Sequence, residues 1–142
     1  MSRHPLHPAL VHFPVACWSL GVAVDAASFV PSVAIWLEGS ERWSAGLFAV
    51  GCLVALPAML AGLVELPRIP EGPALRETWA HMTAMLTAFA LFLGRLVLGL
   101  DGLQPQPPGG LALTFGAFGF VALAAGGWLG GRLVYHHGIG RE

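Results

Sequence analysis

Histidine is the residue of this chain best suited to chemistry, and its distribution along the sequence is uneven. Five of the six histidines lie near the ends of long apolar segments: His7, His12, His81, His136 and His137. Imidazole binds metal ions, holds haem iron as an axial ligand and exchanges protons near neutral pH. Because histidine is scarce in apolar segments, its repeated appearance there suggests a binding site.

The segments that carry the histidines set the class of protein. Hydrophobic residues make up 56% of the 142 residues and charged residues only 11%, whereas a soluble domain is about 25% charged. A soluble fold of this size would lack the charges needed to cover its surface, so lipid must cover it. The length fits a single domain, which we take as residues 1–142.

Four segments approach the roughly 20 residues that cross a bilayer. We expect membrane spans at about residues 8–37, 45–64, 79–100 and 111–135, the first of them bending near Pro31. Backbone groups in lipid must be satisfied internally, so the spans should be helices. Short connections then give an all-α, integral membrane four-helix bundle that runs up-down-up-down.

This topology puts both termini and the connection between spans two and three on one side. Arginines favour that side by five to two, with Arg3, Arg68, Arg76, Arg132 and Arg141 against Arg42 and Arg95. The positive-inside rule therefore predicts cytoplasmic termini.

The lipid bilayer is the expected surrounding of the four spans. The formal charge of -1 and the lack of a basic stripe argue against a nucleic-acid partner.

The same topology gathers the five histidines on that side, and three interpretations remain open. They are interfacial or capping residues, or three or four of them hold copper or zinc, or two of them hold a haem. His7 and His12 lie about 140° apart on an ideal helix, which suits one small ion poorly. Arg76 and Arg132 could pair with haem propionates.

Two charges lie deep in the spans. Asp25 and Arg95 both fall about 20 Å beyond the level of His12 and His81, at 1.5 Å per residue. A lone charge is costly in a membrane, so we expect an Asp25–Arg95 ion pair or a shared wet pocket. Snorkelling of Arg95 to the far headgroups is the alternative.

Small residues recur at four-residue spacing in the second and fourth spans: Ala58 with Gly62, Gly126 with Gly130, and Gly127 with Gly131. Such pairs let helices approach closely. They serve either bundle packing or the accommodation of a flat cofactor.

Several stretches together resemble a known bacterial family. These are the HPALVHFP motif from His7 to Pro14, the GLVE and IP stretch from Gly62 to Pro70, His81, and the GWLGGRLVYHHGIG motif from Gly127 to Gly140. They resemble the domain-of-unknown-function family of small four-helix membrane proteins with an HPxxVHFP signature. Family members usually carry Asp at the position of Glu65, and the family histidine matches His137 rather than His136.

The resemblance implies a bacterial inner-membrane protein in an electron-transfer setting, because related proteins occur fused to Rieske or cytochrome domains. Our leading hypothesis is a cytochrome b-like electron carrier that binds haem b. The candidate ligands are His7, His12, His81 and His137, with His12 and His81 as the favoured pair.

Two alternatives remain: a non-haem metal-binding or transport protein, and an accessory subunit of a larger respiratory or photosynthetic complex. A hydrolytic enzyme is not indicated, because the sequence shows no Ser-His-Asp or paired-carboxylate arrangement. A redox partner protein or a larger membrane complex is the expected partner.

Overall fold

The computed structural model describes residues 6–140 of the chain. Its four long helices are α1 (Leu6–Ala27), α3 (Ser40–Glu65), α4 (Pro73–Leu98) and α5 (Gly110–Tyr135). Within this range all four are long and apolar enough to cross a membrane. The expected all-α four-helix membrane bundle is therefore confirmed. Arg3, His4 and Arg141 lie outside the described residues.

The short elements are the one-turn helix α2 (Pro31–Ala34), the 3-10 turn η1 (Leu66–Arg68) and strands β1 (Leu100–Asp101) and β2 (Gln104–Pro105). The two strands pair antiparallel, Leu100 with Pro105 and Asp101 with Gln104. They lie within the Pro/Gly-rich stretch that joins the third and fourth spans.

Prolines set two boundaries that the sequence interpretation misplaced. The first span was expected to continue to residue 37, but α1 ends at Ala27 and Pro31 begins α2. The third span begins earlier than expected, because Pro73 occupies the first turn of α4 after Gly72, whose φ is 116°. Proline lacks an N–H and fits the first turn of a helix, where that N–H has no partner.

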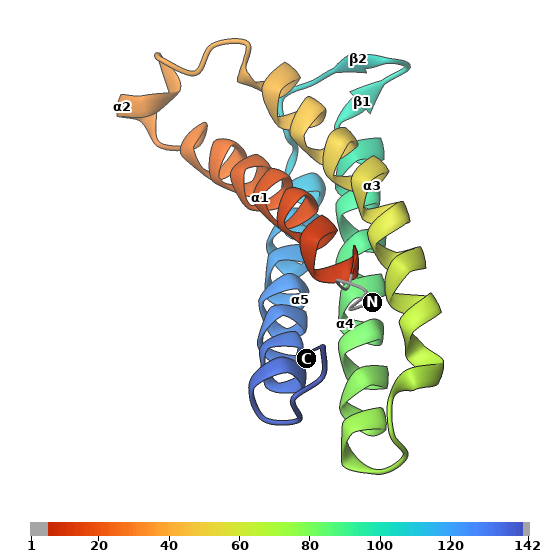
Figure 1. The fold of residues 1–142 in the computed structure, drawn as a ribbon. Coiled ribbons are helices and arrows are strands. Elements are labelled where there is room, and N and C mark those ends of the chain that lie inside the picture. The colour runs from red at the N-terminus through yellow and green to blue at the C-terminus, as the bar shows by residue number, and fades with distance from the viewer. Residues whose placement is uncertain (1–5, 141–142) are drawn as a thin grey trace.

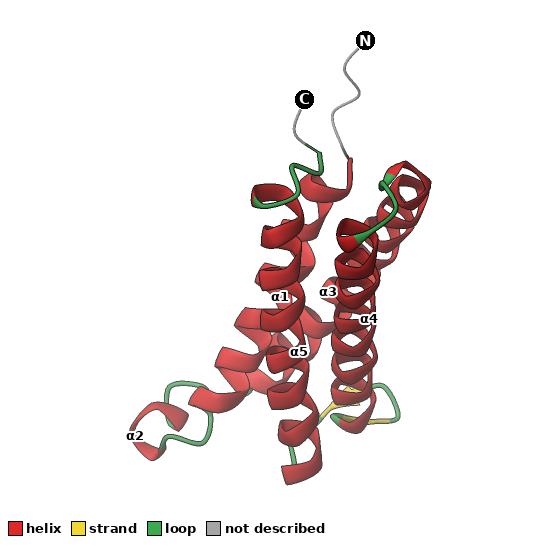
Figure 2. Cartoon of the chain, turned by 90° about the horizontal axis from the view of Figure 1, so that it is seen from below, coloured by secondary structure: helices red, strands yellow, loops and turns green. Residues whose placement is uncertain are grey.

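The long helices form two hairpins. α1 packs along α3 and α4 packs along α5, each far more extensively than one pair packs on the other (Figure 1). We call α1 with α3 the first hairpin and α4 with α5 the second hairpin. Figure 2 shows the start of α1, the end of α5 and the α3–α4 connection at one end, here the histidine end; α2 and the strands lie at the opposite, strand end.

Aromatic rings fill the space between the hairpins. Trp18 of α1, only 1% exposed, stacks on Phe92 of α4 with ring centroids 4.9 Å apart. Phe48 of α3 lies against the same Phe92 ring at 5.6 Å. All three side chains are buried. This cluster fixes the hairpins relative to each other at mid-depth, between the histidine end and the strand end.

Candidate functional site

His7 lies in the first turn of α1, and α3 of the same hairpin holds its ring. Its Nδ1 is 2.7 Å from the carbonyl oxygen of Ala58. A carbonyl oxygen can only accept a hydrogen bond, so Nδ1 carries the proton and donates it. Nε2 is then the nitrogen with a free lone pair. Metal-ligating histidines are commonly oriented by such a bond from the other ring nitrogen.

His81 is held in the same way in the second hairpin. Its Nδ1 lies 2.8 Å from the carbonyl oxygen of Gly126 on α5. The same reasoning makes Nδ1 the donor and leaves Nε2 with the lone pair. Each hairpin therefore presents one half-buried imidazole whose tautomer and orientation are set by a backbone carbonyl.

The two imidazoles lie beside each other between the hairpins, in an edge-on arrangement. The ring centroids of His7 and His81 are 6.2 Å apart and the ring planes are nearly perpendicular, at 89°. One ring comes from α1 and the other from α4. The site therefore depends on how the two hairpins pack together, since neither hairpin contains it alone.

Glycines make room for both rings. A Cβ at Gly62 would lie 3.0 Å from Nδ1 of His7, and a Cβ at Gly130 would lie 3.1 Å from Cε1 of His81. Both distances are tighter than ordinary van der Waals contact. In contrast, a Cβ at Gly127 or Gly131 would meet nothing within 4 Å. The spacing Ala58/Gly62 and Gly126/Gly130 thus serves the histidines, while Gly127/Gly131 does not.

His12, expected to pair with His81, is exposed on α1. Residues five apart on a helix point about 140° away from each other, so His7 and His12 do not share a face. Pro14 does not interrupt α1 between its ends. It is His7 that the structure brings beside His81.

The remaining predicted residues lie nearer the edge of the histidine end. Glu77 binds Arg132 through two contacts, Nη2 to Oε1 at 2.5 Å and Nε to Oε2 at 3.1 Å. His137 Nε2 lies 3.3 Å from Oε2 of Glu77, an ion-pair distance without hydrogen-bond geometry. Arg132 also covers the Trp128 ring at 5.1 Å. Arg76 is exposed.

The candidate histidines do not form a shared metal-ion site. Across residues 6–140, no three histidine, cysteine, aspartate or glutamate side chains come close enough to hold a metal ion. His7 and His81 meet in the seam, His12 lies outside it, and His137 contacts Glu77. A ligand that needs two imidazoles fits this arrangement better than one that needs four.

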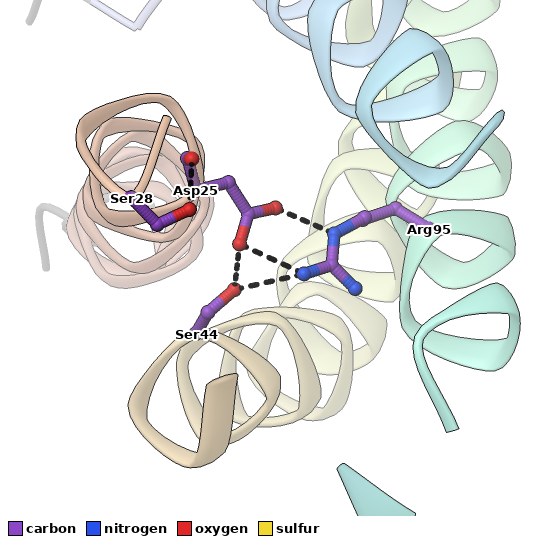
Figure 3. A network of polar contacts seen from close by, with 4 residues as sticks. All are labelled: Asp25, Ser28, Ser44 and Arg95. Atoms are coloured by element: carbon purple, nitrogen blue, oxygen red, sulfur yellow. Dashed lines mark hydrogen bonds and ion pairs between the residues drawn. The ribbon is translucent and has the colours of Figure 1, made fainter. Parts of the chain in front are cut away.

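Asp25 and Arg95 form the ion pair that the sequence predicts. Arg95 donates from Nε to Oδ2 at 2.6 Å and from Nη2 to Oδ1 at 2.8 Å (Figure 3). Ser44 of α3 donates to Oδ1 at 2.5 Å and accepts from Nη2 at 3.1 Å. The guanidinium also lies over the Phe48 ring, 5.0 Å from its centroid. All three polar side chains are buried.

Sequence reasoning missed two side chains of these networks. Glu77 precedes His81 by one helical turn on α4, so its place on the same face was predictable once α4 was known to begin at Pro73. Ser44 was placed outside the second span, which was expected to begin at residue 45. Ser44 lies one turn inside α3, but it follows the polar residues Glu41 and Arg42 in the sequence, so it was assigned to the preceding loop.

Comparisons with known proteins bear on the whole chain. Residues 3–142 match the profile of a family described as predicted membrane protein (DUF2231), a domain of unknown function. No curated protein and no solved structure matches the chain significantly. The match covers nearly every residue, including both histidine motifs and all four long helices. The chain belongs to the DUF2231 family of predicted membrane proteins.

Proposed function

We propose that this protein is a membrane electron-transfer protein in which His7 and His81 would hold the iron of haem b. The observation that carries the proposal is the pair of imidazoles lying beside each other from separate hairpins, each with its Nδ1 engaged by a backbone carbonyl. Bound haem b would supply a one-electron iron couple.

The separation of the rings suits two ligands of one metal centre. A metal ion lies about 2.0–2.1 Å from an imidazole nitrogen, and the ring centre lies about 1 Å further. Two imidazoles on opposite sides of one ion therefore have centres about 6 Å apart. The centroids of His7 and His81 are 6.2 Å apart.

The protein's own residues would orient the ligands and exclude water. The carbonyls of Ala58 and Gly126 would hold the two rings in one tautomer and fix their orientation. Gly62 and Gly130, which leave room for the two imidazoles, would keep this part of the interface free of other side chains. Arg76, exposed at the start of α4, suits a propionate better than Arg132, whose guanidinium already binds Glu77.

The proposed cellular setting is the bacterial inner membrane, with the histidine end toward the cytoplasm. Among residues 6–140, three arginines lie at that end and two at the other, which supports this orientation. Electrons would pass to or from a redox partner protein or a larger membrane complex. A position close to the edge of the bilayer keeps the ligands within reach of such a partner.

Absorption spectroscopy of purified protein tests the proposal. Protein made with adequate haem supply should show the Soret and α bands of six-coordinate haem, and a reduced-minus-oxidised spectrum should show a reversible change. His7→Ala and His81→Ala should each lose the six-coordinate spectrum. His12→Ala, the matched control on the same helix, should keep it.

Three outcomes would contradict the proposal. One is stoichiometric copper or zinc without iron, which would favour a metal-binding or transport protein. Another is protein that contains no chromophore, takes up no haemin and co-purifies in a complex, which would favour an accessory subunit. The third is loss of the spectrum in His12→Ala but not in His7→Ala, which would favour the other ligand pair.

A further inference from the structure

The two helices that carry the site match each other in spacing. His7 and Trp18 are eleven residues apart on α1, and His81 and Phe92 are eleven residues apart on α4. Each residue touches its own counterpart across the seam: His7 meets His81, and Trp18 stacks on Phe92. Contact between equivalent residues is the signature of a two-fold axis passing between them.

The other two helices match as well. Three small residues recur with intervals of seven and four: Gly51, Ala58 and Gly62 on α3, and Gly119, Gly126 and Gly130 on α5. They also make equivalent contacts. A Cβ at Gly51 would lie 2.6 Å from the Trp18 ring, and one at Gly119 would lie 2.8 Å from the Phe92 ring. The carbonyls and glycines around the two histidines correspond in the same register.

Residues on the outside of the bundle follow the same correspondence, in which each residue of α3 matches the residue of α5 that lies 68 positions later in the sequence. Three pairs of large apolar side chains are exposed at both positions: Trp43 (76%) with Leu111 (60%), Leu53 (67%) with Val121 (64%), and Leu60 (63%) with Trp128 (63%). Cys52 (5%) and Phe120 (44%) differ, so the equivalence extends to part of the outer surface of the bundle.

We infer that the chain is two copies of one helix hairpin, related by an approximate two-fold axis along the bundle, with the His7–His81 site on that axis. Each hairpin supplies one imidazole, one orienting carbonyl and one glycine. The consequence for the ligand rests on the proposed function. A ligand on this axis bridges the hairpins and must offer them two equivalent faces, which a planar metal macrocycle does.

The Asp25–Arg95 ion pair is the exception that breaks this symmetry. In the register of α1 and α4, Asp25 corresponds to Gly99 and Arg95 corresponds to Gly21. A Cβ at Gly99 would collide with Nη1 of Arg95, and one at Gly21 would press on the Phe48 ring. The pair therefore occurs once: both positions that would repeat it are glycines, with Gly99 leaving room for the Arg95 guanidinium and Gly21 for the Phe48 ring on which that guanidinium lies.

Matched substitutions in the ligand-free full-length chain test the equivalence in detergent. Gly51→Ala and Gly119→Ala should each lower the melting temperature by about 3–8 °C, since each added methyl overpacks its aromatic neighbour. Gly46→Ala and Gly127→Ala, whose Cβ would meet nothing within 4 Å, are the controls and should leave the melting temperature unchanged or slightly raised. A large effect at one position with none at its counterpart would overturn the inference.

A second measurement keeps the test independent of folding losses. Haemin titration of His7→Ala and His81→Ala should show equal loss of affinity, within about threefold, because the two ligands are equivalent. Unequal losses beyond tenfold would overturn the placement of the ligand on the axis. Wild-type protein that binds no haemin would overturn the proposed function, yet matched effects at Gly51 and Gly119 would still support the repeated hairpin.

Discussion

Asp25 and Arg95 form a two-point ion pair that joins the hairpins about 20 Å from the level of His81, fourteen residues along α4. Within residues 6–140, the ion pairs at the histidine end stay inside the second hairpin and its C-terminal turn. The hairpins are thus held together by charge at the strand end. At the histidine end the short connection through η1 joins α3 to α4, and the His7 and His81 rings lie side by side between the hairpins.

Removing one partner of the buried pair should be costly. Asp25→Ala should lower the free energy of unfolding by about 3–5 kcal/mol, because Arg95 would stay buried and unpaired. Ser44→Ala should cost only about 1–2 kcal/mol, since the ion pair keeps both of its direct bonds. Chemical unfolding in detergent measures both changes.

The double variant Asp25→Leu/Arg95→Met separates the pair's contribution from the cost of an orphaned charge. It should be markedly more stable than Asp25→Ala, because no buried charge remains. A double variant as unstable as the single one would show that the polar network itself is needed for folding.

The glycines beneath the imidazoles should control ligand affinity. Gly62→Val and Gly130→Val should each weaken haemin binding at least about tenfold, equivalent to about 1.4 kcal/mol, because the side chain displaces the ring from its carbonyl. Gly131→Val is the matched control, since a Cβ there meets nothing within 4 Å. Equal affinities in all three variants would mean that the rings are not the ligands.

The perpendicular rings predict a magnetic signature. If His7 and His81 held a haem iron with their planes at 89°, the iron d orbitals that interact with the two rings would be nearly equal in energy. Oxidised low-spin iron held in this way should give a strongly anisotropic electron paramagnetic resonance signal. A weakly anisotropic low-spin signal would indicate parallel rings, and a high-spin signal would indicate that one ligand is missing.

The fold was largely predictable because membrane spans depend on local properties. Run length and hydropathy located four helices without any knowledge of their contacts. The errors fell at helix boundaries near prolines: α1 ends at Ala27 and Pro31 begins the separate helix α2, while Pro73 begins α4 inside a stretch that was taken for a loop. The ion pair was also predictable, since two lone charges at equal depth have few other partners.

The choice among histidines was harder, because it depends on rotation about the helix axis. His7 and His12 lie in the same motif and near the same depth, so hydropathy does not distinguish them. What selects His7 is the pairing of its Nδ1 with Ala58 on α3. That contact spans 51 residues and follows from the packing of two helices, which no local pattern encodes. The sequence signal that could have pointed to His7 is the spacing of small residues, which is the same on α3 beside His7 and on α5 beside His81.

We expect Glu77 to hold residues 136–140 in place and to contribute little to the stability of the bundle. Arg132 is 40% exposed in its ion pair with Glu77, so solvent screens the pair and Glu77→Gln should leave the free energy of unfolding almost unchanged. Residues 136–140, however, pack back on α5 beside this carboxylate. Hydrogen exchange should therefore quicken at those amides alone. Faster exchange throughout α4 and α5 would show that Glu77 supports the whole second hairpin.

Trp18→Phe is the substitution that separates ring stacking from the indole N–H. Nε1 of Trp18 is buried without an oxygen or nitrogen acceptor, and its neighbour is the Cys52 thiol, which is a weak acceptor. Phenylalanine keeps a ring against Phe92, relieves the crowding over Gly51 and removes this weakly paired donor. We expect a change of less than about 1 kcal/mol, whereas Trp18→Ala should cost about 3–5 kcal/mol by leaving a cavity. If Trp18→Phe is as destabilising as Trp18→Ala, the indole N–H has a partner that the seam requires.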